Sequence, residues 1–155
     1  MGIDKEQLRL EIIRPALTYI GLQGQAAENL VLGTAITESR LKYVKQLGSG
    51  PARSLWQIEP RTHDDIWAHY LAHRLELRTM VAALRGDLAD GIDPLIGNLF
   101  YGAAMCRVFY RRVPAPLPLA EDAHGMAAYW KKYYNTHLGK GTIEKAIPHF
   151  KEAIE

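Results

Sequence analysis

The run from Ala26 to Tyr43 has a helical pattern and is apolar on almost every side. A helix that is hydrophobic all round must be covered by other elements, so this segment predicts a buried central helix. On a helical wheel of about 100° per residue, Glu38 falls between Leu41 and Val31, inside the apolar surface. The fold must therefore surround this helix and enclose one acidic side chain with it.

The rest of the chain also has apolar residues at spacings of three and four, which is typical of amphipathic helices. The segment from Gln46 to Pro60 is rich in Gly and Pro and predicts a loop or a short hairpin, and prolines at 114, 116 and 118 predict a stiff connector. We expect an all-α fold forming a single domain over residues 1–155. A first helix is predicted over residues 5–20, with Pro15 kinking or splitting it. One or two helices follow from an N-cap at Thr62 to residue 85, and another begins at Asp93-Pro94. The last two are predicted over 120–134 and after an N-cap at Thr142.

Composition narrows the class of protein. A chain of 155 residues with 48% hydrophobic and 23% charged residues is typical of a soluble globular domain. The net charge of +2 is too small to indicate nucleic-acid binding, and Lys131-Lys132 is only a small basic patch. No run of 18 apolar residues predicts a membrane span. The polar start, Met1–Gln7, lacks the apolar core of a signal peptide.

Cys106 is the only cysteine, so a disulfide within the chain is impossible. Its neighbours are mostly small or apolar, which predicts a buried thiol rather than a nucleophile.

Glu38 is the candidate with the clearest chemistry. A carboxyl group among apolar side chains loses the water that stabilises its charged form, so its pKa should rise. A carboxylic acid that stays protonated near neutral pH can act as a general acid, as in enzymes that cleave glycosidic bonds. The alternative is structural, in which Glu38 caps a backbone group or pairs with Arg40 or Arg53.

Two segments carry a family resemblance. Glu38-Ser39 resembles the Glu-Ser pair of the lysozyme-like superfamily, in its soluble lytic transglycosylase and goose-type lysozyme branch. The segment 54–60, Ser-Leu-Trp-Gln-Ile-Glu-Pro, resembles the Gly-Leu-Met-Gln-Ile-x-Pro segment of that family, and Gln57 follows Glu38 by 19 residues. Ala128-Tyr129 resembles the start of its Ala-Tyr-Asn motif. The longer runs 46–52, 59–67 and 129–135 look like those of a tailed-phage branch of lysozyme-like proteins. The chain departs from the pattern at Ser54, where Gly is usual, and at Trp130, where Asn is usual; Asn135 is a candidate substitute for that Asn.

The resemblance implies a lysozyme-like fold and cleavage of the bond between N-acetylmuramic acid and N-acetylglucosamine, with Glu38 as general acid and base. It also implies substrate contacts. Gln57 would bind an N-acetyl group, and Tyr129 would position the acid or the sugar through its hydroxyl. The other candidates for the substrate-binding cleft are Ser39, Trp56 and Glu59, although Trp56, Tyr129 and Trp130 are equally typical of a core.

The product depends on a second carboxylate. A transglycosylase closes a 1,6-anhydro ring with one acid, whereas a hydrolase normally uses a second carboxylate. Glu59 is the nearest candidate in sequence, followed by Asp64 and Asp65. With no second carboxylate required, we expect anhydro products, and the sequence leaves hydrolysis open.

Metal and cofactor chemistry has little support in the sequence. His69 and His73 are four residues apart and can share a helix face, with His63 and Asp64 nearby. No Glu completes the His-Glu-x-x-His arrangement of a zinc peptidase. We therefore expect a polar helix face, no metal and no cofactor.

The expected partner is the glycan strand of peptidoglycan, with other phage virion proteins as a further candidate. Without a signal peptide, the expected location is the virion or the host cytoplasm, with action on the cell wall. The competing interpretation is a non-catalytic virion or assembly protein on a lysozyme-like scaffold. Ser54 and Trp130 favour that alternative, and Glu38 argues against it.

Overall fold

A computed structural model describes residues 1–135 and 139–155. Helices make up its regular structure and the described residues contain no β-strand, so the all-α prediction is confirmed. The elements are α1 Lys5–Gln7, a π-helical segment Leu8–Ile13, α2 Arg14–Tyr19, α3 Gln25–Ser39, α4 Pro60–His69, a 3-10 turn Leu71–His73, α5 Leu75–Arg85, α6 Pro94–Gly97, α7 Leu99–Arg111, α8 Ala123–Trp130, a π-helical segment Lys131–Asn135 and α9 Ile143–Ile154.

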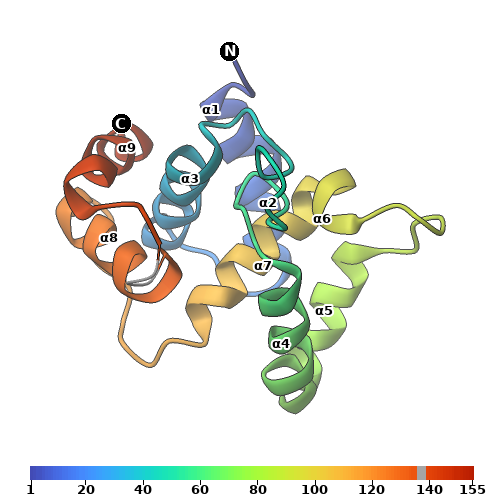
Figure 1. The fold of residues 1–155 in the computed structure, drawn as a ribbon. Helices are drawn as coiled ribbons and strands as arrows, with labels where there is room; N and C mark the ends of the chain where they lie inside the picture. Colours follow the sequence, from blue (N-terminus) through green and yellow to red (C-terminus); the bar gives the residue numbers. More distant parts are fainter. Residues whose placement is uncertain (136–138) are drawn as a thin grey trace.

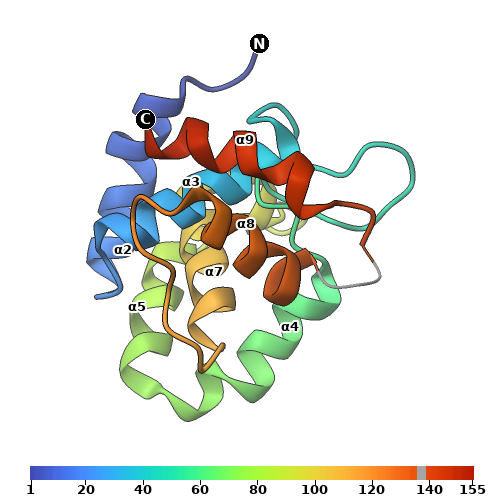
Figure 2. The same cartoon turned by 90° about the vertical axis from the view of Figure 1, so that its left-hand side faces the viewer.

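Helix α3 is the buried central helix that the sequence predicts. Its residues from Ala27 to Ile36 are all buried, and α9 packs along both α3 and α8 (Figures 1 and 2). The closest approach is at Gly33, where a Cβ atom would lie 2.2 Å from the Phe150 ring. Only glycine allows α9 to lie so near α3, and this contact closes the core on one side.

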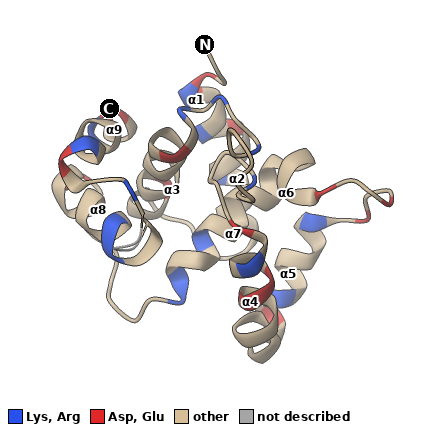
Figure 3. Ribbon diagram, in the orientation of Figure 1, with Lys and Arg blue, Asp and Glu red and all other residues tan. Residues whose placement is uncertain are grey.

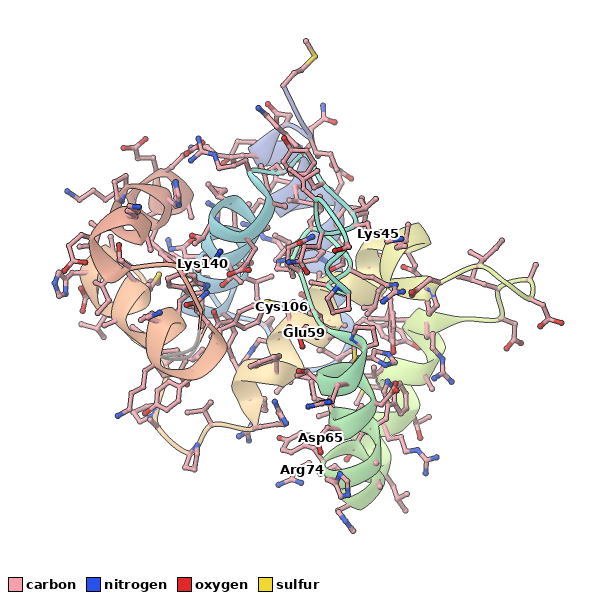
Figure 4. The ribbon with its side chains drawn as sticks, in the orientation of Figure 1. Lys45, Glu59, Asp65, Arg74, Cys106 and Lys140 are labelled. Atoms are coloured by element: carbon pink, nitrogen blue, oxygen red, sulfur yellow. The ribbon has the colours of Figure 1, made fainter. Side chains whose placement is uncertain are left out.

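Helix α7 forms the other side of the core and packs against α2, α3 and α5. A Cβ atom at Gly102 would lie 2.9 Å from the Trp56 ring, so the absence of a side chain there makes room for the indole. Cys106 is fully buried on this helix near the middle of the molecule (Figure 4), which confirms the predicted buried thiol.

The first helical region runs from Lys5 to Tyr19, close to the predicted range, and it changes its hydrogen-bonding pattern ahead of Pro15. Proline has no N–H to donate, and its ring crowds the carbonyl one turn earlier. The wider π turn stands directly before Arg14, whose N–H reaches Arg9 O. The chain thus accommodates Pro15 by widening a turn.

Several predicted boundaries shift. Helix α3 ends at Ser39 and not near Tyr43, because Arg40 and Leu41 adopt left-handed conformations with φ of 54° and 59°. Helix α4 begins at Pro60, so Thr62 is not its N-cap; proline is favoured in the first turn, where its missing N–H costs nothing. The segment before it is a loop with isolated bridges between Lys45 and Arg53 and between Arg53 and Ile58.

The helix predicted to open at Asp93-Pro94 is broken at Asn98. The Asn98 side chain accepts from Tyr101 N at 3.0 Å and donates to Leu84 O at 2.8 Å. It therefore caps α7 and ties it to the end of α5. The predicted cap at Thr142 is confirmed, since its hydroxyl accepts from Lys145 N at 3.2 Å.

Lys and Arg lie on helices on both sides of the molecule and do not gather on one face (Figure 3). In the part of the chain that the structure describes, no helix has the length and apolar character needed to cross a membrane.

Candidate active site

The C-terminal end of α3 opens into a cleft of about 500 Å³. The cleft lies between the loop that follows α3, the start of α4, the C-terminal part of α7 and the π-helical segment after α8. Its lining residues are Glu38, Gln46, Ala52, Gln57, Ile58, Glu59, Thr62, Phe109, Tyr134, Asn135 and Gly139.

Glu38 places its carboxyl group at this cleft with little exposure to water. Burial raises the pKa of Glu38 to about 7, and a hydrogen bond from Trp130 opposes that rise. Ile58, Phe109 and Tyr134 contribute apolar surface to a cleft whose lining is also polar. An acid in this environment is about half protonated at neutral pH, which is the state that a general acid requires.

The structural alternative for Glu38 does not hold. Arg40 turns towards His149, and Arg53 forms an ion pair with Asp93 at 2.8 Å. Within residues 1–135 and 139–155, no cation lies within salt-bridge distance of Glu38, and its side chain accepts one hydrogen bond, from Trp130 Nε1 to Oε2 at 2.9 Å. Neither predicted arginine partner neutralises this carboxyl group.

The loop after α3 is unusually strained. Every non-glycine residue with positive φ in the described part of the chain lies between positions 40 and 57. Ser54, with φ of 75°, occupies the position where the resemblance predicts Gly, and its hydroxyl accepts from Trp56 N at 3.0 Å. This local bond compensates for a left-handed conformation that a side chain disfavours. Such strain is commonly concentrated at functional sites.

Gln57 also has positive φ, at 49°, and it lines the cleft together with Glu38. Its Nε2 donates to Ser54 O at 2.9 Å, which fixes the amide group and leaves its oxygen as an acceptor. The structure therefore brings Gln57 and Glu38 to one cavity, as the resemblance implies.

Trp56 and Ser39 lie outside the cleft, so their predicted substrate contacts are wrong. Trp56 is fully buried and donates from Nε1 to Val31 O at 2.9 Å. Ser39 is 1% exposed, and its hydroxyl donates to Ala35 O at 3.0 Å. Both side chains are used to hold the loop and the end of α3 in place.

Tyr129 also belongs to the core. Its hydroxyl donates to Ala115 O at 3.0 Å, and its ring packs against those of Tyr110 and Tyr133 at 5.6 and 4.8 Å. It is not among the residues that line the cleft, so the predicted role of its hydroxyl beside Glu38 is wrong. Its bond anchors α8 to the proline-rich connector.

Trp130, the next residue, is the one that reaches the acid. It is 2% exposed, and its indole N–H is the hydrogen-bond donor to Glu38. In the sequence, Trp130 is a departure from the family pattern and is equally typical of a core residue. That departure was the available signal, because an N–H donor replaces an Asn at a position next to the predicted site.

Of the three candidates for a second carboxylate, only Glu59 lines the cleft. Glu59 lines the cleft with Glu38, at the start of α4, whereas Asp65 lies farther along that helix (Figure 4). Asp65 binds His69 and Arg112, at 2.9 and 3.2 Å. Asp64 contacts His63 at 2.9 Å, away from the cleft. Among the described residues, Glu59 is the only other carboxylate on the cleft wall.

Two aromatic residues of the cleft were not predicted. Tyr134 donates from its hydroxyl to Trp56 O at 2.5 Å, so it joins the end of the π-helical segment to the loop. Phe109 packs against Tyr134 with ring centroids 4.3 Å apart. Asn135, proposed as a substitute for the family Asn, does line the cleft, and its Oδ1 accepts from Lys131 Nζ at 2.8 Å. Nothing in the local sequence distinguishes the two aromatics from other core residues.

The histidines that raised the question of a metal site have other partners. His63 Nε2 is 2.5 Å from the Tyr101 hydroxyl, and His69 is paired with Asp65. Across residues 1–135 and 139–155, no group of three or more His, Cys, Asp or Glu side chains is placed to hold a metal ion.

No protein-family model, curated protein or solved structure matches this chain. The resemblance to lysozyme-like enzymes therefore rests on the two short segments at 38–39 and 54–60 and on a weaker match at 128–129.

Proposed function

We propose that the protein cleaves the glycan strands of peptidoglycan, with Glu38 as the general acid and then the general base. The observation that carries this proposal is a carboxyl group with a pKa of about 7 at the wall of a 500 Å³ cleft. A structural carboxylate would have a cation or several donors, and Glu38 has a single indole N–H in the described residues.

In the proposed reaction, Glu38 donates its proton to the oxygen between N-acetylmuramic acid and N-acetylglucosamine. The bond from that oxygen to the muramic acid carbon breaks, and its electron pair stays on the departing oxygen. Glu38, now a carboxylate, accepts a proton from the attacking hydroxyl. Gln57 supports substrate binding, since its free amide oxygen can accept from the N–H of an N-acetyl group.

The attacking hydroxyl defines two versions of this proposal. Attack by the 6-hydroxyl of muramic acid gives a 1,6-anhydro product and needs no second carboxylate, and this is the version that we favour. Attack by water gives hydrolysis, and Glu59 is the residue positioned on the cleft wall to assist it.

The biological setting is also a proposal. The resemblance to a tailed-phage branch suggests a muralytic role in lysis or in a virion that breaches the wall. The non-catalytic virion protein is the competing function, and the inward orientation of Trp56 and Tyr129 favours it, because neither aromatic ring offers a sugar platform.

The experiment is a digestion of purified peptidoglycan by the wild-type protein, by Glu38→Gln and by Glu59→Gln, with mass spectrometry of the soluble products. We expect wild-type and Glu59→Gln to release products lighter by one water than those of a hydrolase. Reducing ends throughout, lost in Glu59→Gln, would show hydrolysis. If wild-type and Glu38→Gln both release nothing while still binding the wall, the non-catalytic function is correct.

A further inference from the structure

Trp130 is the only described hydrogen-bond partner of the Glu38 side chain, and it contacts one oxygen, Oε2. We propose that Trp130 is a positioning residue that keeps the transferable proton of Glu38 on Oε1, the oxygen that has no hydrogen-bond partner among the described residues. This inference rests on the proposed function, because it concerns how the acid of that reaction is held.

The argument begins with the two oxygens of a protonated carboxyl group. One is a carbonyl oxygen, which is the better acceptor, and the other carries the hydrogen and acts as a donor. A donor fixed at Oε2 therefore favours the form in which Oε2 is the carbonyl oxygen and Oε1 carries the proton. When the proton leaves Oε1 for the glycosidic oxygen, the same N–H remains to stabilise the new carboxylate.

The identity of the donor matters as well as its position. An indole nitrogen donates and cannot accept, whereas an amide or a phenol also has an oxygen that accepts. An amide or a phenol at position 130 could take the Glu38 proton as a hydrogen bond and compete with the substrate. Trp130 replaces the Asn that the resemblance predicts there, and it removes this competition.

The indole is held rigidly enough for this role. It is 2% exposed, and a Cβ atom at Gly141 would lie 2.5 Å from its ring, so the backbone before α9 packs directly against it. A ring enclosed in this way cannot turn its N–H to a different acceptor without moving the backbone. The orientation of the donor is therefore part of the fold.

The other titratable groups near Glu38 do not take over the role of Trp130 in positioning its proton. Burial raises the pKa of Cys106, Tyr110 and Tyr134 well above their ordinary values, so these three neighbours are neutral near pH 7. Their side chains come from α7 and from the π-helical segment after α8.

Three charged side chains come from segments near Glu38, and two of them, Lys131 and Arg40, form hydrogen bonds with other residues. Glu59 lines the same cleft as Glu38 and is exposed to solvent. Lys131 binds Asn135 Oδ1 and Gly139 O, and Arg40 turns to His149. Glu59 stays in place in all the variants described below, so it does not confound the comparison.

The chain offers a matched control. Trp56 and Trp130 are both buried tryptophans whose indole N–H donates over 2.9 Å, Trp56 to a backbone carbonyl and Trp130 to Glu38. Trp56→Phe and Trp130→Phe therefore remove the same kind of bond, and only Trp130→Phe removes it from the acid. Benzothienylalanine at position 130, which has sulfur in place of the N–H, keeps the shape of the indole if Phe leaves a cavity.

The test measures the Glu38 carboxyl by carbon-detected NMR, assigned by comparison with Glu38→Gln, together with the pH profile of wall cleavage. An N–H donor favours the charged form, so its loss raises the pKa of Glu38. We expect the titration midpoint to rise by about one unit in Trp130→Phe and in the benzothienyl protein. The alkaline limb of kcat should move up by the same amount, and kcat below pH 6 should fall about tenfold. Trp56→Phe should leave the midpoint unchanged.

Two results overturn the inference. One is a Glu38 titration that does not move in Trp130→Phe, and the other is an equal shift in Trp56→Phe. Either result, with active wild-type protein, leaves the proposed function standing. Wild-type protein that cleaves no wall overturns the proposed function instead, and the titration still decides whether Trp130 controls Oε2.

Discussion

Helix α3 carries two glutamates with opposite surroundings, the buried Glu28 in its first turn and the partly buried Glu38 in its last. Glu28 accepts two hydrogen bonds from Arg14, at 2.9 and 3.0 Å, and lies 3.9 Å from Arg9. Glu38 has no such cation in the described residues and accepts one bond from a neutral indole. The two carboxyl groups, both shielded from water, therefore differ in whether a cation compensates for the lost hydration.

The helix itself adds to this difference. Its N-terminal end carries a partial positive charge and its C-terminal end a partial negative charge, so a carboxylate is stabilised near the first turn and destabilised near the last. Glu28 and Glu38 occupy these two ends. One helix thus holds an ion-paired carboxylate and, ten residues later, a carboxyl group with a raised pKa.

The largest effect should separate the two glutamates by activity. Glu38→Gln keeps the shape of the side chain but cannot donate a proton, so wall cleavage should fall by about 10²–10⁴-fold. Glu28→Gln, measured at a temperature where it is folded, should cleave at close to the wild-type rate. The rate of turbidity loss of purified walls measures the activity of both variants. If the two variants lost activity to a similar extent, the different surroundings of Glu28 and Glu38 would not explain catalysis.

The two glutamates should also differ in stability, because Glu38→Gln should stabilise the fold at high pH whereas Glu28→Gln should destabilise it. Glu38 titrates at about 7 in the fold and at 4.5 when unperturbed, so the folded protein binds the extra proton between those values. The free energy of unfolding should therefore fall as pH rises from 4.5 to 7. Glu38→Gln removes this loss and should be more stable than wild-type above pH 7, by on the order of 3 kcal/mol at most.

Glu28→Gln should instead be less stable at pH 7, by about 1.5–3 kcal/mol, because its arginines lose a charged acceptor. Urea denaturation at pH 5 and pH 8 measures both variants. A Glu38→Gln protein that is destabilised equally at the two pH values would show that Glu38 is not a neutral acid in the fold.

A cation placed at the cleft should make Glu38 resemble Glu28. Gln57→Lys puts an ammonium group on the cleft wall and should lower the pKa of Glu38 by about 1–3 units, since an opposite charge favours the carboxylate. Gln57→Met loses the same bond to Ser54 without adding charge, so it is the matched control. NMR titration of Glu38 gives the answer, and equal midpoints in the two variants would contradict the electrostatic explanation.

The smallest effect should come from weakening the pair at Glu28. Arg14 has a side chain that is 52% exposed, so its bond to Glu28 competes with water. Arg14→Gln should lower the free energy of unfolding only slightly, because exposed ion pairs contribute little to stability. Thermal denaturation measures it, and a loss as large as that of Glu28→Gln would mean that Arg9 contributes little to the site.

The positions of Glu38 and Gln57 in one cleft follow from patterns visible in the chain. The all-round apolar run predicts a buried helix, the Gly- and Pro-rich segment after it predicts a loop, and the resemblance implies that Gln57 lies near the acid. The failures are Trp56, Ser39 and Tyr129, each of which has a polar atom that binds a backbone carbonyl in the core. Periodicity gives the face of a helix, but it cannot tell which carbonyl a buried donor will find.

The sequence by itself determined the helical class, the burial of α3 and the presence of one acid within its apolar surface, because these depend on the order of apolar and polar residues along the chain. Only the tertiary structure decided that the acid has an indole N–H from α8 as its partner and shares a cleft with Glu59. Trp130 lies 92 residues from Glu38, and a contact over that separation forms only when the packing of α3, α8 and α9 is complete. The pKa of Glu38 depends on that packing, because desolvation and hydrogen bonding are properties of its surroundings in space.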